Sequence, residues 1–207
     1  MAEMSDKLAQ MKLIPVVVIE DAADAAPLGQ ALIEGGLPCA EVTFRTAAAP
    51  DAILAMSKLD GLLLGAGTVL TVDQAKQAVD CGAEFIVTPG FNPKVVGYCV
   101  DNGISITPGV CTPTEIEAAM GFGLTVVKFF PAEAFGGLKT LKAISAPYPM
   151  MRFVPTGGIN AANIGEYLGF EKVLACGGSW IVKKDLIAAQ KFDEITELTK
   201  TAMAAIG

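Results

Sequence analysis

The sequence predicts an α/β fold in which parallel strands and helices alternate around a closed barrel. Short runs rich in Val, Ile and Phe alternate with longer stretches of helical character. Several of the apolar runs are continuous, as they are in strands that are covered on both faces. About eight strand–helix units follow one another at intervals of roughly 20 to 24 residues, which favours a (β/α)8 TIM barrel. An open doubly wound sheet is the alternative.

The predicted strands are the apolar runs, and polar residues or glycines stand at or just after most of their ends. Their ranges are Ile14–Glu20, Cys39–Arg45, Leu62–Thr68, Phe85–Pro89, Ser105–Val110, Val126–Pro131, Phe153–Gly157 and Val173–Gly177. A short N-terminal helix is expected before the first strand. The other predicted helices are Pro27–Gly36, Asp51–Lys58, Asp73–Cys81, Pro93–Asp101, Pro113–Gly121, Lys139–Ser145, Asn160–Leu168 and the C-terminal stretch Asp185–Ile206.

Two helix starts are marked by side chains that can satisfy free backbone N–H groups. Thr112-Pro-Thr-Glu115 has the capping-box pattern, with proline at the first helical position. Thr71-Val-Asp-Gln74 predicts a second capping box. Glycines that can end helices follow several of the predicted segments: Gly35, Gly36, Gly82, Gly103 and Gly121.

The 207 residues are predicted to form one domain, residues 1–207. A composition that is 52% hydrophobic and 18% charged, with a mean hydropathy of +0.50, is typical of a globular protein. A chain of this size buries roughly 70% of its unfolded surface, which is enough for a core without disulfide or metal staples. No linker, low-complexity tract or charge run divides the sequence.

Charge and hydropathy exclude several kinds of partner. The formal net charge is −7, and no cluster of Lys and Arg indicates a nucleic-acid surface. Residues 1–12 include charged side chains and lack the apolar segment of a signal peptide. No apolar stretch approaches the ~20 residues of a membrane span. We therefore expect a cytoplasmic protein with neither membrane nor nucleic-acid partners.

The absence of histidine limits the chemistry. With 0 His, the Ser-His-Asp and Cys-His nucleophile systems and imidazole metal sites are excluded. The 5 Cys have no CxxC spacing, which argues against a disulfide framework or a thiolate metal site. Acid–base chemistry must then use carboxylate, lysine, tyrosine, cysteine or water. No metal or cofactor is predicted, and Cys176 is assigned no role.

Lys128 is the most informative residue, because it lies inside the apolar run Thr125-Val-Val-Lys-Phe-Phe-Pro131. Burial disfavours the charged form of a lysine, and a neutral amine attacks carbonyl carbons to form a Schiff base. The pattern alone gives similar weight to another interpretation, in which the lysine reaches solvent or forms a structural ion pair.

Polar residues gather at the carboxyl ends of the predicted strands, where barrels carry their active sites. Glu41, Thr43 and Arg45 alternate along one strand and therefore share a face. Without histidine, a partly buried Glu41 is the natural proton shuttle for the amine, and a Glu41–Arg45 ion pair in the barrel wall is the alternative. Arg45 can instead hold a substrate carboxylate with its planar guanidinium, or lie at the surface.

Glycines follow the last two predicted strands and suggest a phosphate site. Gly157-Gly158 and Gly177-Gly178-Ser179 stand where barrels often bind phosphate through backbone N–H groups. A single glycine pair usually marks only a turn, whereas two pairs at neighbouring strand ends favour the phosphate site. The adjacent Trp180 is predicted to have a packing role.

A series of motifs extends in order over essentially the whole chain: Glu41-Val-Thr-Phe-Arg-Thr46, Gly65-Ala-Gly-Thr-Val69, Pro108-Gly109, Val127-Lys-Phe-Phe-Pro-Ala-Glu133, Pro155-Thr-Gly-Gly-Ile159 and Gly177-Gly-Ser-Trp180. This series resembles the 2-dehydro-3-deoxy-6-phosphogluconate (KDPG) aldolases, which often also act on 4-hydroxy-2-oxoglutarate (KHG). The sequence departs from the family at Phe44, where leucine is usual, and we expect only a packing change there. Lys183-Lys184 replaces the more familiar sequence after the eighth strand.

The resemblance implies a class I aldolase, a lyase without metal, built as a (β/α)8 barrel and commonly a homotrimer. It places the Schiff base on Lys128, the acid–base role on Glu41 and recognition of the pyruvyl carboxylate on Arg45. The other implied contacts are Thr68, Pro89 and Thr156 along the site and Gly157, Gly158 and Ser179 at the phosphate.

The implied reaction cleaves KDPG to pyruvate and glyceraldehyde 3-phosphate, and KHG to pyruvate and glyoxylate, in Entner–Doudoroff-type sugar-acid catabolism. Two other functions fit the residues. One is an isomerase or decarboxylase in which Lys128 acts as a point charge. The other is a barrel that only binds a phosphorylated sugar acid. Reductive trapping of a pyruvate adduct separates these functions from an aldolase.

Overall fold

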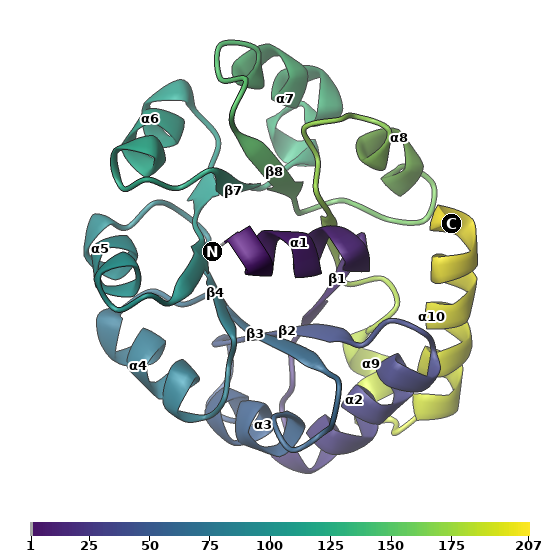
Figure 1. Ribbon diagram of the computed structural model, residues 1–207. Helices are drawn as coiled ribbons and strands as arrows, with labels where there is room; N and C mark the ends of the chain where they lie inside the picture. Colours follow the sequence, from purple (N-terminus) through teal and green to yellow (C-terminus); the bar gives the residue numbers. More distant parts are fainter. Residues whose placement is uncertain (1) are drawn as a thin grey trace.

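The computed structural model describes residues 2–207, and its parallel strands form a curled sheet surrounded by helices (Figure 1). The predicted α/β class with parallel strands is therefore confirmed. The strands are β1 Leu13–Val17, β2 Cys39–Thr43, β3 Leu63–Gly67, β4 Phe85–Val87, β5 Ser105–Thr107, β6 Gly109–Val110, β7 Val126–Phe129, β8 Arg152–Pro155 and β9 Cys176–Gly178.

Parallel pairing joins the strands in two groups. The larger has the order β5-β4-β3-β2-β1-β9 and the smaller the order β6-β7-β8. Pro108 alone separates β5 from β6, where proline has no N–H to donate, and its carbonyl accepts a hydrogen bond from the Lys128 N–H at 2.8 Å. The predicted strand Ser105–Val110 is thus interrupted. Single parallel bridges, Phe153 to Val173 and Thr156 to Gly177, join β8 and the residue after it to the segment that ends in β9.

Helices surround the strands, and one helix crosses them. Figure 1 shows α1 lying across the opening of the curled sheet, as the predicted N-terminal helix. The helices are α1 Ala2–Met11, η1 Ala22–Asp24, α2 Ala25–Glu34, α3 Ala49–Met56, α4 Val72–Asp80, α5 Pro93–Asp101, α6 Pro113–Gly121, η2 Glu133–Phe135, α7 Gly137–Ser145, α8 Ile164–Leu168, α9 Lys184–Ala188 and α10 Phe192–Ile206, where η marks a 3₁₀ helix.

Most predicted strands extend too far at their carboxyl ends. Thr68 has a φ of 55° and Gly157 a φ of 100°, both in the left-handed region that a strand does not contain. The residues that turn the backbone there are the polar and glycine residues of the motifs. The strands therefore end before the residue ranges that the apolar pattern predicted for them.

Several predicted helices are shifted by about two residues, and the two stretches nearest to the C-terminus differ most from the structure. The stretch Asp185–Ile206 forms α9 and α10, which are separated near Gln190, a residue with a φ of 54°. The predicted helix from Asn160 starts only at Ile164, because the Asn160 side chain accepts a hydrogen bond from the Ala162 N–H at 2.9 Å. This local side-chain bond competes with helix formation.

One of the two predicted capping boxes is complete. At α6, the Thr112 hydroxyl accepts from the Glu115 N–H at 3.4 Å, and the Glu115 carboxylate accepts from the Thr112 N–H at 2.9 Å. At α4, Thr71 accepts from the Gln74 N–H at 3.1 Å, but the Gln74 side chain accepts from the Leu70 N–H at 2.7 Å instead. The second box is therefore only half formed.

The cysteines are free thiols, three of them buried. Burial raises the pKa of Cys99 to about 11 and the pKa of Cys176 to about 12, which makes both thiols poor nucleophiles. Across residues 2–207, no helix combines the length and apolar character needed to cross a membrane. The same residues include no group of three potential metal ligands.

Candidate active site

A buried ion pair joins β7 to β2. The Lys128 Nζ lies 3.4 Å from Oε1 of Glu41, and the two side chains are 7% and 3% exposed. A buried charge is costly unless a partner compensates it, so each of these groups depends on the other. Glu41 pairs with Lys128 rather than with Arg45, which had been the structural alternative.

The surroundings of the pair fix its position. A Cβ atom on Gly67 of β3 would lie 2.2 Å from Oε1 of Glu41, so a larger residue there would displace the carboxylate. The Phe130 ring centroid lies 5.1 Å from the Lys128 Nζ, within range of a cation–π interaction. On the side of α1, Leu8 closes a space of about 10 Å³ beside the pair, near the smallest volume that holds one water molecule.

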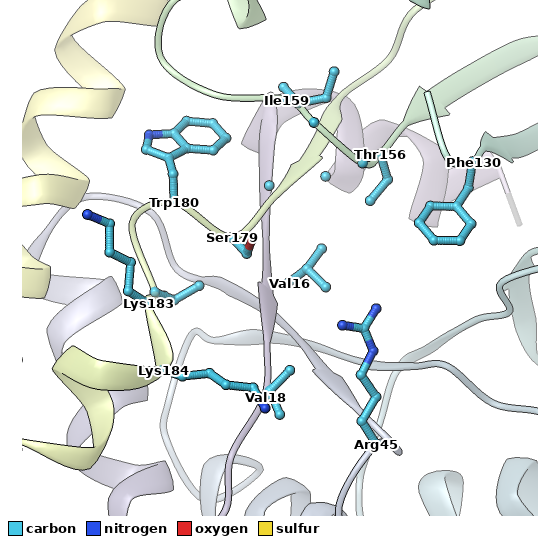
Figure 2. Close-up of a pocket in the computed structure, with 15 residues that line it drawn as sticks. Val16, Val18, Arg45, Phe130, Thr156, Ile159, Ser179, Trp180, Lys183 and Lys184 are labelled. Carbon is cyan, nitrogen blue, oxygen red and sulfur yellow. The ribbon is translucent and has the colours of Figure 1, made fainter. Parts of the chain in front are cut away.

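A larger cavity of about 460 Å³ opens beside the ends of β1, β8 and β9 (Figure 2). Its lining brings together the predicted residues Arg45, Thr156, Gly157, Gly158 and Ser179, and adds Val16, Val18, Phe130, Ile159, Gly177, Gly178, Trp180, Val182, Lys183 and Lys184. Lys128 and Glu41 lie deeper, outside this lining. Phe130 connects the two regions, because it lines the cavity and contacts the Lys128 amine.

Arg45 reaches the cavity from the loop after β2. Figure 2 shows its guanidinium directed toward the centre of the cavity, near Val16. Thr43, two residues earlier, is fully buried and donates its hydroxyl to the Val17 carbonyl at 2.8 Å, which ties β2 to β1. Arg45 forms no ion pair with any of residues 2–207, so its planar donors are available to a carboxylate or phosphate.

The turn after β8 presents backbone N–H groups because its carbonyl groups are held elsewhere. The Gly157 carbonyl accepts from the Glu133 N–H at 3.0 Å, and the Gly158 carbonyl accepts from the Asn160 and Asn163 side chains, both at 3.1 Å. Both glycines have positive φ, 100° and 82°. Within residues 2–207 their N–H groups donate no hydrogen bond, and successive free N–H groups in a turn can form an anion-binding nest.

Glu133 supports this turn from behind. Tyr167 donates its hydroxyl to the Glu133 carboxylate, and burial together with this hydrogen bond raises the pKa of Tyr167. A Cβ atom on Gly158 would lie 2.6 Å from both Cβ and Cγ of Glu133. The glutamate of the Lys-Phe-Phe-Pro-Ala-Glu motif thus positions the turn, a role that the motif alone did not predict.

The end of β9 forms the opposite side of the cavity. Thr156 packs on Gly177, where a Cβ atom would lie 2.3 Å from the threonine Oγ1. The Trp180 ring covers Gly178, where a Cβ atom would lie 1.9 Å from the ring. Trp180 also lines the cavity beside Ser179, so the prediction of a packing role alone was incomplete.

Thr68 and Pro89 lie outside this cavity. Thr68 follows β3 in its left-handed conformation and is partly buried. The Pro89 carbonyl oxygen packs on Gly109, where a Cβ atom would lie 2.2 Å away, and Gly109 pairs in register with Lys128. Pro89 also lines a separate open pocket of about 400 Å³. These two residues therefore lie on the side of Glu41 and Lys128 rather than in the lining of the larger cavity.

The sequence interpretation missed several cavity residues. Phe130 is apolar and was read as part of a strand, although its position two residues after Lys128 could have indicated contact with the amine. Lys183 and Lys184 were noted only as a departure from the family pattern. Two lysines directly after a glycine-rich strand end could have indicated an anion site.

The chain matches a known family over nearly its whole length. A family model described as KDPG and KHG aldolase matches residues 4–198. The chain belongs to this family. The family resemblance inferred from the motifs is therefore confirmed.

Members of the KDPG and KHG aldolase family are similar to this chain from end to end. The 2-dehydro-3-deoxy-phosphogluconate aldolase of Treponema pallidum is 50% identical over 208 residues, which cover 100% of this chain and 99% of that protein. The structure of the KDPG aldolase of Legionella pneumophila is 39% identical, with a TM-score of 0.92 over 96% of this chain and 97% of that one. It holds pyruvate captured at low pH as a covalent carbinolamine intermediate.

A second solved structure in the family, the 2-keto-3-deoxy-6-phosphogluconate aldolase of Zymomonas mobilis, holds 3-phosphoglycerate. It is 39% identical, with a TM-score of 0.90 over 97% of this chain and 95% of that one.

Proposed function

We propose that this chain is a class I aldolase that cleaves KDPG to pyruvate and glyceraldehyde 3-phosphate, and also cleaves KHG to pyruvate and glyoxylate. Its role would be in Entner–Doudoroff-type sugar-acid catabolism. The observation that carries this proposal is the buried Lys128–Glu41 pair, whose Nζ and Oε1 atoms lie 3.4 Å apart. The pair lies beside a cavity whose hydrogen-bond donors are free to bind an anion, in a chain that belongs to this family.

In the proposed mechanism, Lys128 is the nucleophile. A proton passes from its ammonium group to Glu41, and the neutral amine attacks the C2 ketone of the substrate. The resulting carbinolamine loses its hydroxyl as water, with the proton supplied by Glu41, and an iminium ion forms. This cation withdraws electrons from the C3–C4 bond.

Glu41 then moves the protons of bond cleavage. Its carboxylate accepts the proton of the C4 hydroxyl, the C3–C4 bond breaks, and the aldehyde leaves while the electron pair forms an enamine. Glu41 returns that proton to C3, and water hydrolyses the iminium to release pyruvate and restore the Lys128 ammonium group beside the Glu41 carboxylate. With no histidine in the chain, one carboxylate beside the amine serves every proton transfer.

The proposed binding contacts follow the cavity. Arg45 holds the pyruvyl carboxylate, and Thr156 lies between this end and the anion-binding turn. The N–H groups of Gly157, Gly158 and Ser179 hold the phosphate, whose remote binding energy orients the reacting carbons. Thr68 and Pro89 stay in the proposal as contacts at the strand ends nearest to Glu41 and Lys128.

We further propose that residues 1–207 form one domain with a closed (β/α)8 barrel. The single bridges from Phe153 and Thr156 to the segment that ends in β9, and the pairing of β9 with β1, support closure. A cytoplasmic homotrimer that needs neither metal nor cofactor completes the proposal, and it rests on the family resemblance.

Reductive trapping tests the proposed function. After incubation with pyruvate and borohydride, the wild-type protein should gain one covalent adduct, and peptide mass mapping should locate it at Lys128. Lys128→Met should form no adduct and should lose cleavage by on the order of 10⁴-fold or more. Absence of an adduct in the wild-type protein, or an adduct on another lysine, would contradict the proposal and favour an isomerase, a decarboxylase or a binding protein.

Two controls separate chemistry from stability. Loss of Lys128 alone leaves Glu41 unpaired, which costs about 3–5 kcal/mol, so the double variant Lys128→Met/Glu41→Gln provides an inactive protein with a neutral core. Lys142→Met should keep the adduct and the activity. The Lys142 amine also lies over a phenylalanine ring, 5.6 Å from the centroid of Phe170, but it is exposed on α7.

A further inference from the structure

The cavity is positively charged although the chain is acidic. The formal net charge is −7, yet the residues that line the cavity include Arg45, Lys183 and Lys184 and no aspartate or glutamate. Local cationic side chains at a concave surface attract anions regardless of the net charge of the protein. Arg45 is assigned to the substrate carboxylate in the proposed function, which leaves the two lysines without a role.

The two lysines are placed differently. Figure 2 shows Lys184 extending from the start of α9 toward Val18, along the edge of the cavity that faces Thr156 from the opposite side, whereas Lys183 extends away from the cavity centre on the side of Trp180. The Lys184 Nζ lies 3.2 Å from Oε1 of Glu20, and these side chains are 62% and 68% exposed. An ion pair exposed to this degree is weak and exchanges readily with other partners.

From this placement we propose that Lys184 is a specificity-determining residue that selects phosphorylated over unphosphorylated substrate, and that Glu20 competes with the phosphate for it. The inference rests on the proposed function, because it concerns the distal end of the same substrate. A phosphate monoester carries a charge of about −1.5 to −2 at neutral pH, whereas the hydroxyl that replaces it is neutral. Lys184 therefore distinguishes the two substrates by charge.

The N–H groups of Gly157 and Gly158 would orient the phosphate through hydrogen bonds, and Lys184 would compensate its negative charge. Backbone N–H groups carry only partial charges and leave most of the phosphate charge uncompensated. Lys184 lines the same cavity as the turn, from the opposite edge, and therefore adds a full positive charge to the cavity without occupying the reaction centre. When the phosphate arrives, the amine exchanges its exposed partner Glu20 for a dianion.

The test compares kcat/KM for KDPG with kcat/KM for the same sugar acid without its phosphate. Lys184→Ala should lower the ratio of these two values by about three- to tenfold, and Lys183→Ala should lower it less. Inorganic phosphate should also inhibit KDPG cleavage more weakly in Lys184→Ala than in the wild-type protein. In Glu20→Gln the ratio should rise by about two- to threefold, because the competing carboxylate is gone.

A matched pair of variants controls for the loss of one surface charge. Lys191 forms a similar exposed pair with Glu194, at 3.5 Å and with side chains 58% and 52% exposed, but it does not line the cavity. Lys191→Ala and Glu194→Gln should leave the ratio unchanged. A ratio that is unaffected in Lys184→Ala, or that falls equally in Lys191→Ala, would overturn the role of Lys184.

A separate result would contradict the proposed competition between Glu20 and the phosphate. If the ratio of the two kcat/KM values falls in Glu20→Gln, Glu20 only holds Lys184 in place. Failure of the proposed function is distinguished separately: the wild-type protein would then cleave neither compound and would trap no pyruvate.

Discussion

At Gly67 the lack of a side chain determines where a buried carboxylate can lie. The Glu41 side chain packs directly against Gly67, and its Oε1 would be 2.2 Å from a Cβ atom at that position. This glycine belongs to the Gly65-Ala-Gly-Thr-Val69 motif, so the motif has a steric meaning. It keeps Glu41 within reach of the Lys128 amine.

Gly67→Ala should therefore reduce activity without unfolding the protein. The new methyl group displaces the Glu41 carboxylate by about 1 Å, and a misplacement of this size lowers kcat by about 10²-fold. Aldol cleavage and circular dichroism measure the two effects. Gly121→Ala is the matched control, since a Cβ atom there has no neighbour within 4 Å. Equal activity in both variants would refute this account of Gly67.

Single residues differ in how far the sequence reveals them. Lys128 could be predicted because a charged letter inside an apolar run is unusual, whatever its partner. The left-handed backbone of Thr68 could not be predicted, because β-branched residues seldom adopt it. The support that Glu133 gives to Gly158 depends on a contact between segments that follow different strands.

At the scale of elements, α6 shows how one side chain holds a helix start. The Glu115 carboxylate accepts hydrogen bonds from the backbone N–H groups of Cys111 and Thr112 and from the Thr112 hydroxyl. Partial burial favours the neutral acid, but these hydrogen bonds outweigh it and lower the pKa of Glu115 below its ordinary value of 4.5.

Glu115→Ala should lower the free energy of unfolding by about 1 kcal/mol at neutral pH. A carboxyl whose pKa is depressed by folding stabilises the protein above its unfolded pKa, and this stabilisation is lost as the pH falls through the lower folded value. The difference between wild type and variant should thus shrink below about pH 4.5. Urea unfolding at neutral and acid pH measures it, with the exposed Glu171→Ala as control. A difference that stays constant with pH would exclude this role of the carboxylate.

Element types were predictable from periodicity, whereas element ends were not. Helices α5 and α6 match their predicted ranges, because proline starts both and capping residues precede them. The ends of the strands depend on backbone conformation at glycine and threonine, and the interruption at Pro108 depends on pairing with β7. The pattern of apolar residues predicts neither the backbone conformation at these positions nor the pairing between strands.

At the scale of the whole molecule, α1 covers one end of the curled sheet and reaches the reaction centre from the side opposite the cavity. Leu8 is 3% exposed and shares a space of about 10 Å³ with Glu41, Lys128 and Phe85. The helix thus contributes both to the core and to the exclusion of water from the ion pair. Its position across the sheet could not be deduced from its own sequence.

Leu8→Ala should cost about 2–5 kcal/mol of unfolding free energy, because it leaves a cavity in the core. It should also admit water beside Lys128 and Glu41 and lower kcat more than it changes KM. Thermal unfolding and steady-state kinetics measure the two effects, with the exposed Gln10→Ala of the same helix as control. An unchanged melting temperature would show that α1 is not part of the core.

The dependence of Lys128 and Glu41 on each other constrains the descent of this chain. A lineage that lost one of them first would inherit an unpaired buried charge, at a cost of about 3–5 kcal/mol out of a total stability of about 5–15 kcal/mol. Few such intermediates would survive selection for folding alone. We therefore expect the two residues to be passed on together or replaced together, since only the loss of a single partner carries this cost.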